Sequence, residues 1–327
     1  MSTLRFSLFN LSISFPRIAT TWFVVSVVVL PSVVGAEDAE KDEAPPDPVV
    51  EVLTTKDQVS LNCTFYPGTN GKETVPIVMV HGWKGVRGEF DRIARYLQSL
   101  GHAVMVPDLR GHGESTQRRT LNGENQIINP DRMKPAQIAG MYEFDLEAVK
   151  TFLLKKNNDG ELNIEMLTLV GSEMGTIVAM NWAVIDWSWP QLPTLKQGQD
   201  VKALVLISPI LASKGLKIQL ALRNPDVRSL PTLIMVGNQN RRSNTDAKKL
   251  HSRLKRYHLR ESKDPKEANR KQSLFFADFD TSLKGTKLIE ARVEHKNYSP
   301  YEWIGGVIHL RLVQQQASYP WRDRSRK

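Results

Sequence analysis

Leu169-Val170-Gly171-Ser172-Glu173-Met174-Gly175 is the stretch of this sequence that decides the fold. It closes a short apolar run at residues 166–170, which is typical of a buried strand, and a helical pattern follows at once over residues 176–184. Glycines stand two residues before and two residues after Glu173. A strand that turns directly into a helix at a glycine-flanked residue predicts an α/β architecture.

The rest of the chain supports that architecture. Helical spacing appears over residues 89–100 and 145–154, and an alternating polar and apolar pattern over residues 48–53 and 59–65 predicts an N-terminal antiparallel hairpin. Strands that alternate with helices predict a mostly parallel central sheet with helices on both faces. Five further apolar runs predict its other strands, at residues 75–80, 102–107, 201–207, 233–236 and 274–279.

Two more motifs follow predicted strands. The first is Val80-His81-Gly82-Trp83, and the second is Pro107-Asp108-Leu109-Arg110-Gly111-His112-Gly113-Glu114-Ser115. With the stretch around Glu173 as the third in order, the chain resembles the α/β-hydrolase family over roughly residues 50–312, in particular lid-less lipases, esterases and serine aminopeptidases. The resemblance implies the α/β-hydrolase fold. It implies an oxyanion segment at His81 and Gly82, and a turn built by Asp108, Arg110, Gly111 and Gly113.

The resemblance also implies a position for the nucleophile. In this family it sits on a sharp, strained turn between a strand and a helix, and small residues are needed two places before and after it. Gly171 and Gly175 meet that need only if Glu173 is the central residue. A central Ser172 would have bulky neighbours at both places. Glu173 therefore stands where the family has its serine.

Two backbone N–H groups should face this position. The resemblance assigns the oxyanion-hole-like donors to Trp83 and Met174, at the start of a helix. A glutamate side chain reaches further than a serine side chain does. We therefore expect the Glu173 carboxylate to fold back and accept hydrogen bonds from both N–H groups.

The acid and the base of the family's triad are also replaced. By their places after the last two strands, Asn240 occupies the acid position and Thr286 the base position. An amide can orient an imidazole but cannot stabilise an imidazolium by charge. Among the seven histidines only His295 could swing toward the site, and we expect it in an exposed loop. With serine, acid and histidine all replaced, conventional serine-hydrolase activity is not expected.

Three functions fit these residues. The first is a catalytically inactive pseudo-hydrolase that keeps a pocket for an anion or another small-molecule or peptide ligand. The second is an active hydrolase with Glu173 as a carboxylate nucleophile, by analogy with haloalkane dehalogenases and epoxide hydrolases of the family. The third is surface binding, independent of the pocket. Neither a metal nor a cofactor is predicted, and the oligomeric state is left open.

The N-terminus predicts export. Arg5 and Arg17 precede an apolar run at residues 22–34 that is interrupted by Pro31, and small residues follow it. This order is typical of a cleaved signal peptide, and a retained one would anchor the chain to a membrane. The expected destination is periplasmic or extracellular. The predicted organisation is a signal peptide at 1–36, a disordered acidic and proline-rich linker at 37–48, the α/β-hydrolase domain at 49–318 and a basic tail at 319–327.

The net charge of +9 is concentrated in one segment. Residues 241–271 carry twelve Lys or Arg against four Asp or Glu, which makes them a candidate contact for an anionic surface such as a polysaccharide or lipid headgroups. No nucleic-acid motif is present. The single cysteine, Cys63, excludes an intramolecular disulfide and is expected to be a small buried hydrophobe. The polar residues 116–134 are expected to form an irregular loop over the carboxyl edge of the sheet.

Overall fold

The apolar runs form the central strands of one sheet. The computed structural model describes residues 44–190, 192, 196–258 and 271–325. The parallel strands follow the order β12-β11-β8-β7-β3-β4, and the predicted mostly parallel sheet is confirmed. Their bounds are β3 (Pro76–Val80), β4 (Ala103–Pro107), β7 (Leu167–Ser172), β8 (Val201–Ile207), β11 (Thr232–Gly237) and β12 (Leu274–Phe279). Every residue of β3, β4, β7 and β11 is buried, because helices cover both faces of the sheet.

The predicted N-terminal hairpin is confirmed. Strands β1 (Val49–Thr54) and β2 (Val59–Tyr66) pair antiparallel, and β2 also pairs antiparallel with β4. Alternate residues of β2 are buried, as expected for a strand with one face on the core. Cys63 is among them, and burial raises the pKa of its thiol, so that it behaves as a small apolar side chain.

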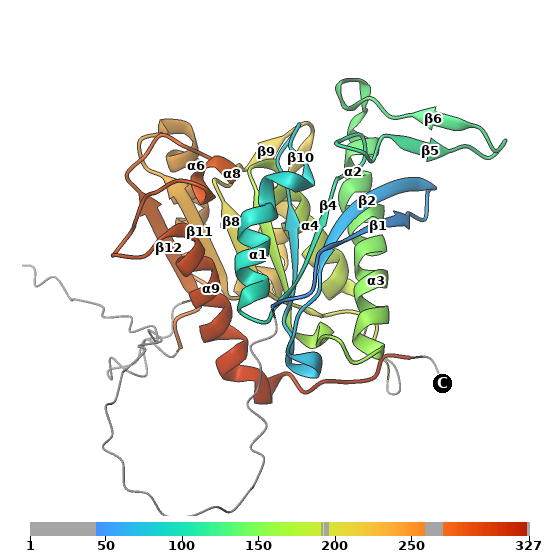
Figure 1. Cartoon of the computed structure of the whole chain (residues 1–327). Helices are drawn as coiled ribbons and strands as arrows, with labels where there is room; N and C mark the ends of the chain where they lie inside the picture. Colours follow the sequence, from blue (N-terminus) through green and yellow to red (C-terminus); the bar gives the residue numbers. More distant parts are fainter. Residues whose placement is uncertain (1–43, 191, 193–195, 259–270, 326–327) are drawn as a thin grey trace, which may run out of the picture. The chain divides into compact units, whose positions relative to one another are not determined.

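The expectation of an irregular loop over residues 116–134 is wrong. The segment contains β5 (Gln117–Arg119) and β6 (Asn125–Ile127), which form a hairpin. Strand β5 pairs with Val59 and Ser60 of β2, so the hairpin extends the sheet instead of covering its edge. It projects from the body of the domain (Figure 1). The segment's polar side chains concealed this pairing, since they give no apolar alternation.

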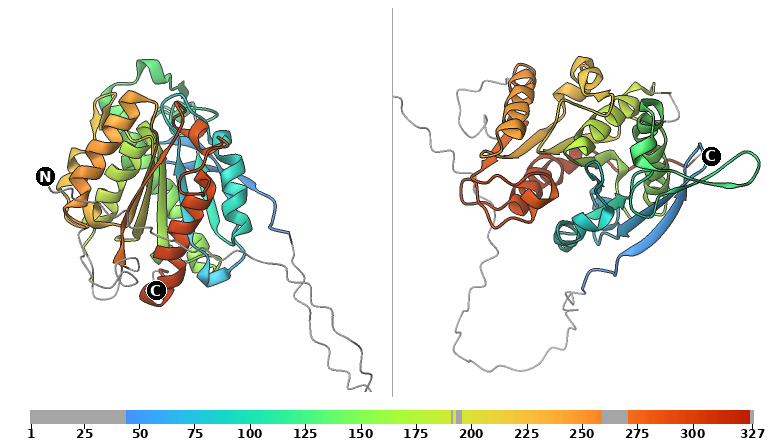
Figure 2. Two further views of the ribbon diagram at one scale, coloured as in Figure 1. Left: turned by 90° about the vertical axis from the view of Figure 1, so that its left-hand side faces the viewer. Right: turned by 90° about the horizontal axis from the view of Figure 1, so that it is seen from above.

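Helices cover both faces of the sheet, as predicted. Helices α1 (Asp91–Ser99) and α9 (Pro300–Arg311) lie on one face, and α3 (Leu146–Asn158), α4 (Met174–Ser188) and α6 (Arg241–Lys255) lie on the other (Figure 2). A π-helical turn at Met141–Asp145 joins α2 to α3. The remaining short α-helices and strands are α2 (Pro135–Gly140), β9 (Ala212–Ser213), β10 (Leu216–Lys217), α5 (Gln219–Arg223) and α8 (Thr286–Ile289).

Helix α4 lies at the centre of the core. It is apolar on nearly all sides, which is typical of a helix that is buried all round. Trp182 is fully buried, and its indole N–H donates to Glu147 Oε1 of α3 over 2.7 Å, so the one polar atom of this side chain is paired. This packing fixes α4 against the sheet and thereby fixes the turn that precedes it.

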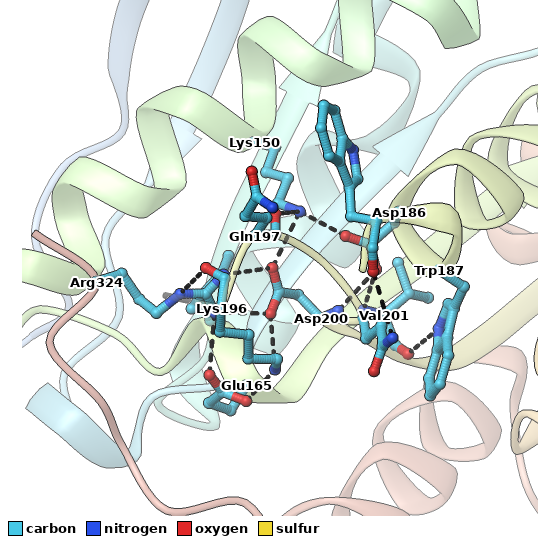
Figure 3. A network of polar contacts seen from close by, with 12 residues as sticks. Lys150, Glu165, Asp186, Trp187, Lys196, Gln197, Asp200, Val201 and Arg324 are labelled. Atoms are coloured by element: carbon cyan, nitrogen blue, oxygen red, sulfur yellow. Dashed lines mark hydrogen bonds and ion pairs between the residues drawn. The ribbon is translucent and has the colours of Figure 1, made fainter. Parts of the chain in front are cut away.

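A buried network of charges lies at the amino edge of the sheet, before β7 and β8 (Figure 3). Lys150 Nζ lies 2.5 Å from Asp186 Oδ1 and 3.0 Å from Asp200 Oδ2. Asp186 Oδ2 also accepts the backbone N–H of Asp200 at 2.7 Å and of Val201 at 3.0 Å. Each charge here has an opposite charge or a backbone group beside it, which buried charges require.

The C-terminal segment completes this network. Arg324 pairs with Asp200 at 2.9 Å and with Glu165 at 3.0 Å, and Lys196 pairs with the same two carboxylates. Residues 319–325, the described part of the predicted tail, are thus joined to the amino edge. At the other end of the described chain, the carbonyl of Pro46 accepts a hydrogen bond from the Gln98 amide.

Residues 1–43, with the predicted signal peptide and most of the predicted linker, lie outside the described residues, as do residues 259–270 of the basic segment. Within the part of the chain that is described, no helix has both the length and the apolar composition needed to span a membrane.

Candidate functional site

Glu173 lies at the tip of the turn between β7 and α4. Its backbone has φ 49° and ψ −113°, a region that side-chain-bearing residues rarely adopt and that costs on the order of 1–3 kcal/mol. The turn is held on both sides: the Glu173 N–H donates to the Ile207 carbonyl at 2.9 Å, and the Thr176 hydroxyl donates to the Glu173 carbonyl at 2.6 Å. The surrounding structure therefore forces a strained residue to present its side chain above the sheet.

The two flanking glycines are required by close packing. A Cβ on Gly171 would lie 2.6 Å from the Gly175 carbonyl oxygen, and a Cβ on Gly175 would overlap the Val80 carbonyl oxygen at the end of β3. Ser172, by contrast, is the last residue of β7 and is buried. The structure thus places Glu173, and not Ser172, at the exposed point of the turn.

The Glu173 carboxylate pairs with a residue that the sequence did not single out. Its Oε1 lies 2.7 Å from Lys284 Nζ, and the side chains are 32% and 54% exposed. Its Oε2 lies beside the backbone of Gly82 and Gly285, where an added Cβ would be 3.3 Å and 2.9 Å away. The carboxylate therefore lies between the loops that follow β3 and β12, in a place that only glycines leave open.

The expectation that Glu173 occupies the oxyanion position itself is wrong. The backbone N–H groups of Trp83 and Met174 make no hydrogen bond with its carboxylate in the described part of the chain, and Lys284 is its partner instead. An ammonium group competes well with two neutral N–H donors, because a hydrogen bond between two charged groups is the stronger kind. The two amides remain available to another acceptor.

The acid and base positions are used for other contacts. Asn240 caps α6: its Oδ1 accepts the Ser243 N–H at 3.1 Å. The Thr286 hydroxyl donates to Glu89 Oε2 at 2.7 Å. Neither side chain bonds to Glu173, so the structure does not join the three triad positions into a relay.

His295 is also occupied away from the turn. Its Nδ1 lies 2.8 Å from the Asp278 carbonyl oxygen and 3.1 Å from Asp278 Oδ1, and its ring contacts Phe279 and Trp303. It is half-buried against β12, and the expectation of an exposed loop is wrong on this point. With these partners, His295 serves the packing of α9 against β12.

His81 joins two loops at the carboxyl edge. Its Nε2 accepts the Leu109 N–H at 3.0 Å, so its Nδ1 carries the proton and donates to the Gly82 carbonyl at 2.7 Å. Burial lowers the pKa of His81 to about 4, which keeps the ring neutral near pH 7. A neutral ring with a hydrogen bond at each nitrogen holds Gly82 beside Glu173.

Asp108 organises the loop after β4. Its carboxylate accepts the N–H of Arg87 at 2.6 Å and of Glu114 at 3.1 Å, and pairs with the Arg87 guanidinium. A Cβ on Gly113, which has φ +49°, would overlap this carboxylate. Asp108 and Gly113 of the motif therefore serve the structure of this loop.

Arg110 anchors the same loop to α3 and the N-terminal hairpin. Its guanidinium pairs with Asp145 at 2.7 Å and with Asp57 at 2.8 Å. Gly111, with φ +77°, allows the chain to turn immediately afterwards. Burial raises the pKa of Asp145 to about 6 even though Arg110 beside it favours the ionised form.

Lys284 and Ser208 are the site residues that the sequence analysis missed. Ser208 follows β8 with φ 47°, and its Oγ accepts the Gly285 N–H at 2.9 Å, which holds the Lys284 loop against the turn. In the sequence the only local signal was Gly285, a glycine beside the expected base position. In the structure its φ is +61°. Among the described residues, no cluster of histidine, cysteine and carboxylate side chains could hold a metal ion.

The comparisons with known proteins agree with this geometry. Residues 75–287, more than half of the chain, match the family model described as alpha/beta hydrolase fold. The chain therefore belongs to the α/β-hydrolase fold family. A non-heme chloroperoxidase of Burkholderia pyrrocinia is 37% identical over 65 residues, a match that spans only 20% of this chain and 22% of that protein.

Solved structures share the fold at low sequence identity. An esterase of Pyrococcus furiosus superposes with a TM-score of 0.53 and 16% identity, over 91% of this chain and all of that one. A fungal esterase of Rhizomucor miehei gives a TM-score of 0.53 and 14% identity, over 84% of this chain and 86% of that one. At these identities the likeness concerns the fold alone.

Proposed function

We propose that this chain is an exported, non-catalytic member of the α/β-hydrolase family that binds a ligand at the turn where its relatives carry out chemistry. The observation that carries the proposal is the pair between Glu173 and Lys284 at the tip of that turn. It replaces a nucleophile by a carboxylate held by an ammonium group, and no histidine bonds to either residue in the described chain.

The geometry favours binding of an anion at this place. The N–H groups of Trp83 and Met174 are not used by Glu173, and α4 begins at Met174 with its unpaired N–H groups. Lys284 is more than half exposed and can turn toward a ligand. An anionic ligand that displaces the Glu173 carboxylate from Lys284 would have an ammonium group and two N–H donors around it.

Ester hydrolysis is the first activity to test, because structures that share the fold include esterases. We expect no turnover of p-nitrophenyl butyrate or of aminoacyl naphthylamides above that of heat-denatured protein. Glu173→Ser alone should also be inactive, since members of a triad act as a unit and the other two are absent. Turnover by the wild-type chain that Lys284→Met or Glu173→Gln abolishes would refute a non-catalytic role.

The carboxylate-nucleophile alternative has a test of its own. The Glu173 carboxylate is partly exposed, so a small electrophile can reach it. After incubation with 1-bromobutane or an epoxide, peptide mass spectrometry should find Glu173 unmodified, with Glu173→Gln as the control. An ester on Glu173 that turns over with time would make the chain an enzyme with a carboxylate nucleophile.

A second contact surface is proposed on α6. The helix buries Ser243, Ala247, Leu250 and Leu254. Its exposed basic residues, which make no ion pair within the described chain, are Arg241, Arg242, Lys248, Lys249, Arg253 and Lys255. Such a face would hold a polyanion such as a polysaccharide or a lipid headgroup surface, in a salt-dependent way.

Retention on immobilised heparin tests the α6 surface. The triple charge reversal Lys248→Glu, Lys249→Glu and Arg253→Glu should elute at clearly lower salt than a reversal of three basic residues elsewhere, at Lys72, Lys155 and Arg322. Equal elution of the two variants would mean that net charge alone causes retention.

Export is tested by the intact mass of the secreted chain, which should begin near Glu37; a mass that includes residues 1–36 would contradict cleavage.

A further inference from the structure

A cavity lies beside the projecting β5–β6 hairpin, apart from the turn that carries Glu173. It has a volume of about 440 Å³, within the range of roughly 300–1,000 Å³ that small-molecule sites occupy. Neither Glu173, Trp83 nor Lys284 lines it. Its walls come from the β1–β2 turn, β2, the loop after β4, the β5–β6 hairpin, the loop after β6, the start of α2 and the end of the π-helical turn.

Three neighbouring strands, β2, β5 and β6, each place one side chain on the same wall of the cavity. Val59 of β2 is the partner of Arg118 in β5, and Arg118 is the partner of Gln126 in β6. Residues that are directly opposite across a sheet point to the same face, and all three line the cavity. The neighbouring Arg119 points to the other face and does not line it.

Two guanidinium groups in the lining are uncommitted. Arg118 donates only its Nε, to the Asp57 carbonyl at 3.0 Å, so both of its terminal nitrogens are without a partner in the described chain. The Arg132 guanidinium makes no hydrogen bond or ion pair there either, and the residue is exposed. Each group carries a planar fork of N–H donors that suits a carboxylate or a phosphate.

The other charges in the lining belong to one ion-paired group around Arg110. Asp57 accepts Arg110 Nη1 at 2.8 Å and Nη2 at 2.9 Å, and it also accepts the Thr55 hydroxyl at 2.8 Å. Arg110 is shared with the buried Asp145. One Arg110 guanidinium faces the two carboxylates of Asp57 and Asp145, so these three groups carry a net charge of −1. Arg118 and Arg132 bring the local sum to +1, which still favours an anion.

The rest of the wall is mixed, with the polar Gln126, Asn129 and Gln137 beside an apolar part. Ile127, Ile128, Met133 and Phe144 line the cavity, and the Arg110 guanidinium covers the Phe144 ring with its carbon 5.4 Å from the centroid. Ile127 is 79% exposed, so one large apolar side chain of the lining lies largely open to solvent. A site with an apolar part and a few charged and polar groups fits a ligand of matching character.

We propose that this cavity binds a small organic anion with an apolar body, whose carboxylate or phosphate is held by Arg118 and Arg132. The apolar body lies against Ile128, Met133 and Phe144. This site is independent of the Glu173 turn and does not depend on whether the chain is catalytic.

Calorimetric titration of the full-length chain at low salt tests the proposal with defined probes. 4-Phenylbutyrate carries the charge and the apolar body, 4-phenylbutanol carries only the body, and acetate carries only the charge. Phenyl phosphate distinguishes a phosphate from a carboxylate head. We expect saturable binding of 4-phenylbutyrate or phenyl phosphate, and weaker binding of both the alcohol and acetate.

The matched variants are Arg118→Gln/Arg132→Gln, which removes the two proposed contacts, and Arg119→Gln, which removes a neighbouring charge on the opposite face. The double variant should weaken binding of the anionic probes about tenfold or more, and Arg119→Gln should leave binding unchanged. Melting temperatures equal to wild type show that the variants are folded. A double variant that does not fold is replaced by Arg132→Gln, since the Arg132 side chain makes no hydrogen bond or ion pair with the described residues. Absence of saturable binding by either anionic probe, equal binding of 4-phenylbutanol, or an equal effect of Arg119→Gln would each overturn the proposal.

Discussion

The two edges of the central sheet both carry pairs of opposite charges, but in different surroundings. At the amino edge, Lys150, Asp186 and Asp200 are almost fully buried and each has more than one partner (Figure 3). At the carboxyl edge, Glu173 and Lys284 are partly exposed and form a single contact. Buried charges that lose a partner are costly, whereas exposed pairs contribute little.

This difference shows at which edge of the sheet residues can be substituted without loss of the fold. A substitution in the amino-edge network leaves a charge buried without its partner, so it threatens the fold itself. The turn at the carboxyl edge is held by the Glu173 N–H on the Ile207 carbonyl and by the Gly285 N–H on the Ser208 hydroxyl. The partly exposed side chains of Glu173 and Lys284 are therefore expected to contribute little to folding. A triad can therefore be lost at this edge while the α/β-hydrolase fold persists.

The largest expected effect is on the amino edge. Lys150→Met leaves Asp186 and Asp200 without their shared ammonium group, and we expect the free energy of unfolding to fall by about 3–5 kcal/mol. Urea denaturation measures this. Lys155→Met, on the exposed side of the same helix, is the control and should change stability by no more than about 0.5 kcal/mol. Similar losses in both variants would mean that the buried network is not special.

The pH dependence of stability tests whether the amino-edge network acts through its charges. Burial alone would raise the pKa of Asp200, but Lys150, Lys196 and Arg324 lower it from 3.8 to about 2. A carboxylate with a lowered folded-state pKa stabilises the fold above its unfolded-state pKa, and that contribution disappears as pH falls through the folded-state value.

Asp200→Asn should therefore destabilise the chain by about 2 kcal/mol at pH 7, and the gap to wild type should close between pH 4 and pH 2. Denaturation midpoints measured over this range check the expectation. A gap that stays constant down to pH 2 would show that Asp200 acts by its shape and not by its charge.

The smallest expected effect is at the carboxyl edge. Lys284→Met removes the only charged partner that Glu173 has among the described residues, but both side chains are partly solvated, so stability should fall by no more than about 1 kcal/mol. Glu173→Gln should have a similarly small effect, and high salt should reduce both. A loss as large as that of Lys150→Met would show that the pair holds the fold together.

The sequence predicted most of the fold, since the continuous apolar runs at β3 and β7 and the glycines around Glu173 carry local signals. It did not predict the β5–β6 hairpin, whose pairing with β2 depends on backbone hydrogen bonds between polar residues. It also missed Lys284, because the pair joins residues 111 positions apart and no spacing rule links them. The partners of His295 were missed for the same reason, since Asp278 and Trp303 come from different elements.

Labelling by a fluorophosphonate probe tests the central claim most directly. The probe reacts with activated serine nucleophiles. In this chain the turn presents Glu173 paired with Lys284, and Ser172 is buried. Wild-type chain should therefore show no probe adduct by intact mass under conditions that fully label an esterase of the same family. A stoichiometric adduct on Ser172 that disappears in Ser172→Ala would contradict the account and make the chain a serine hydrolase.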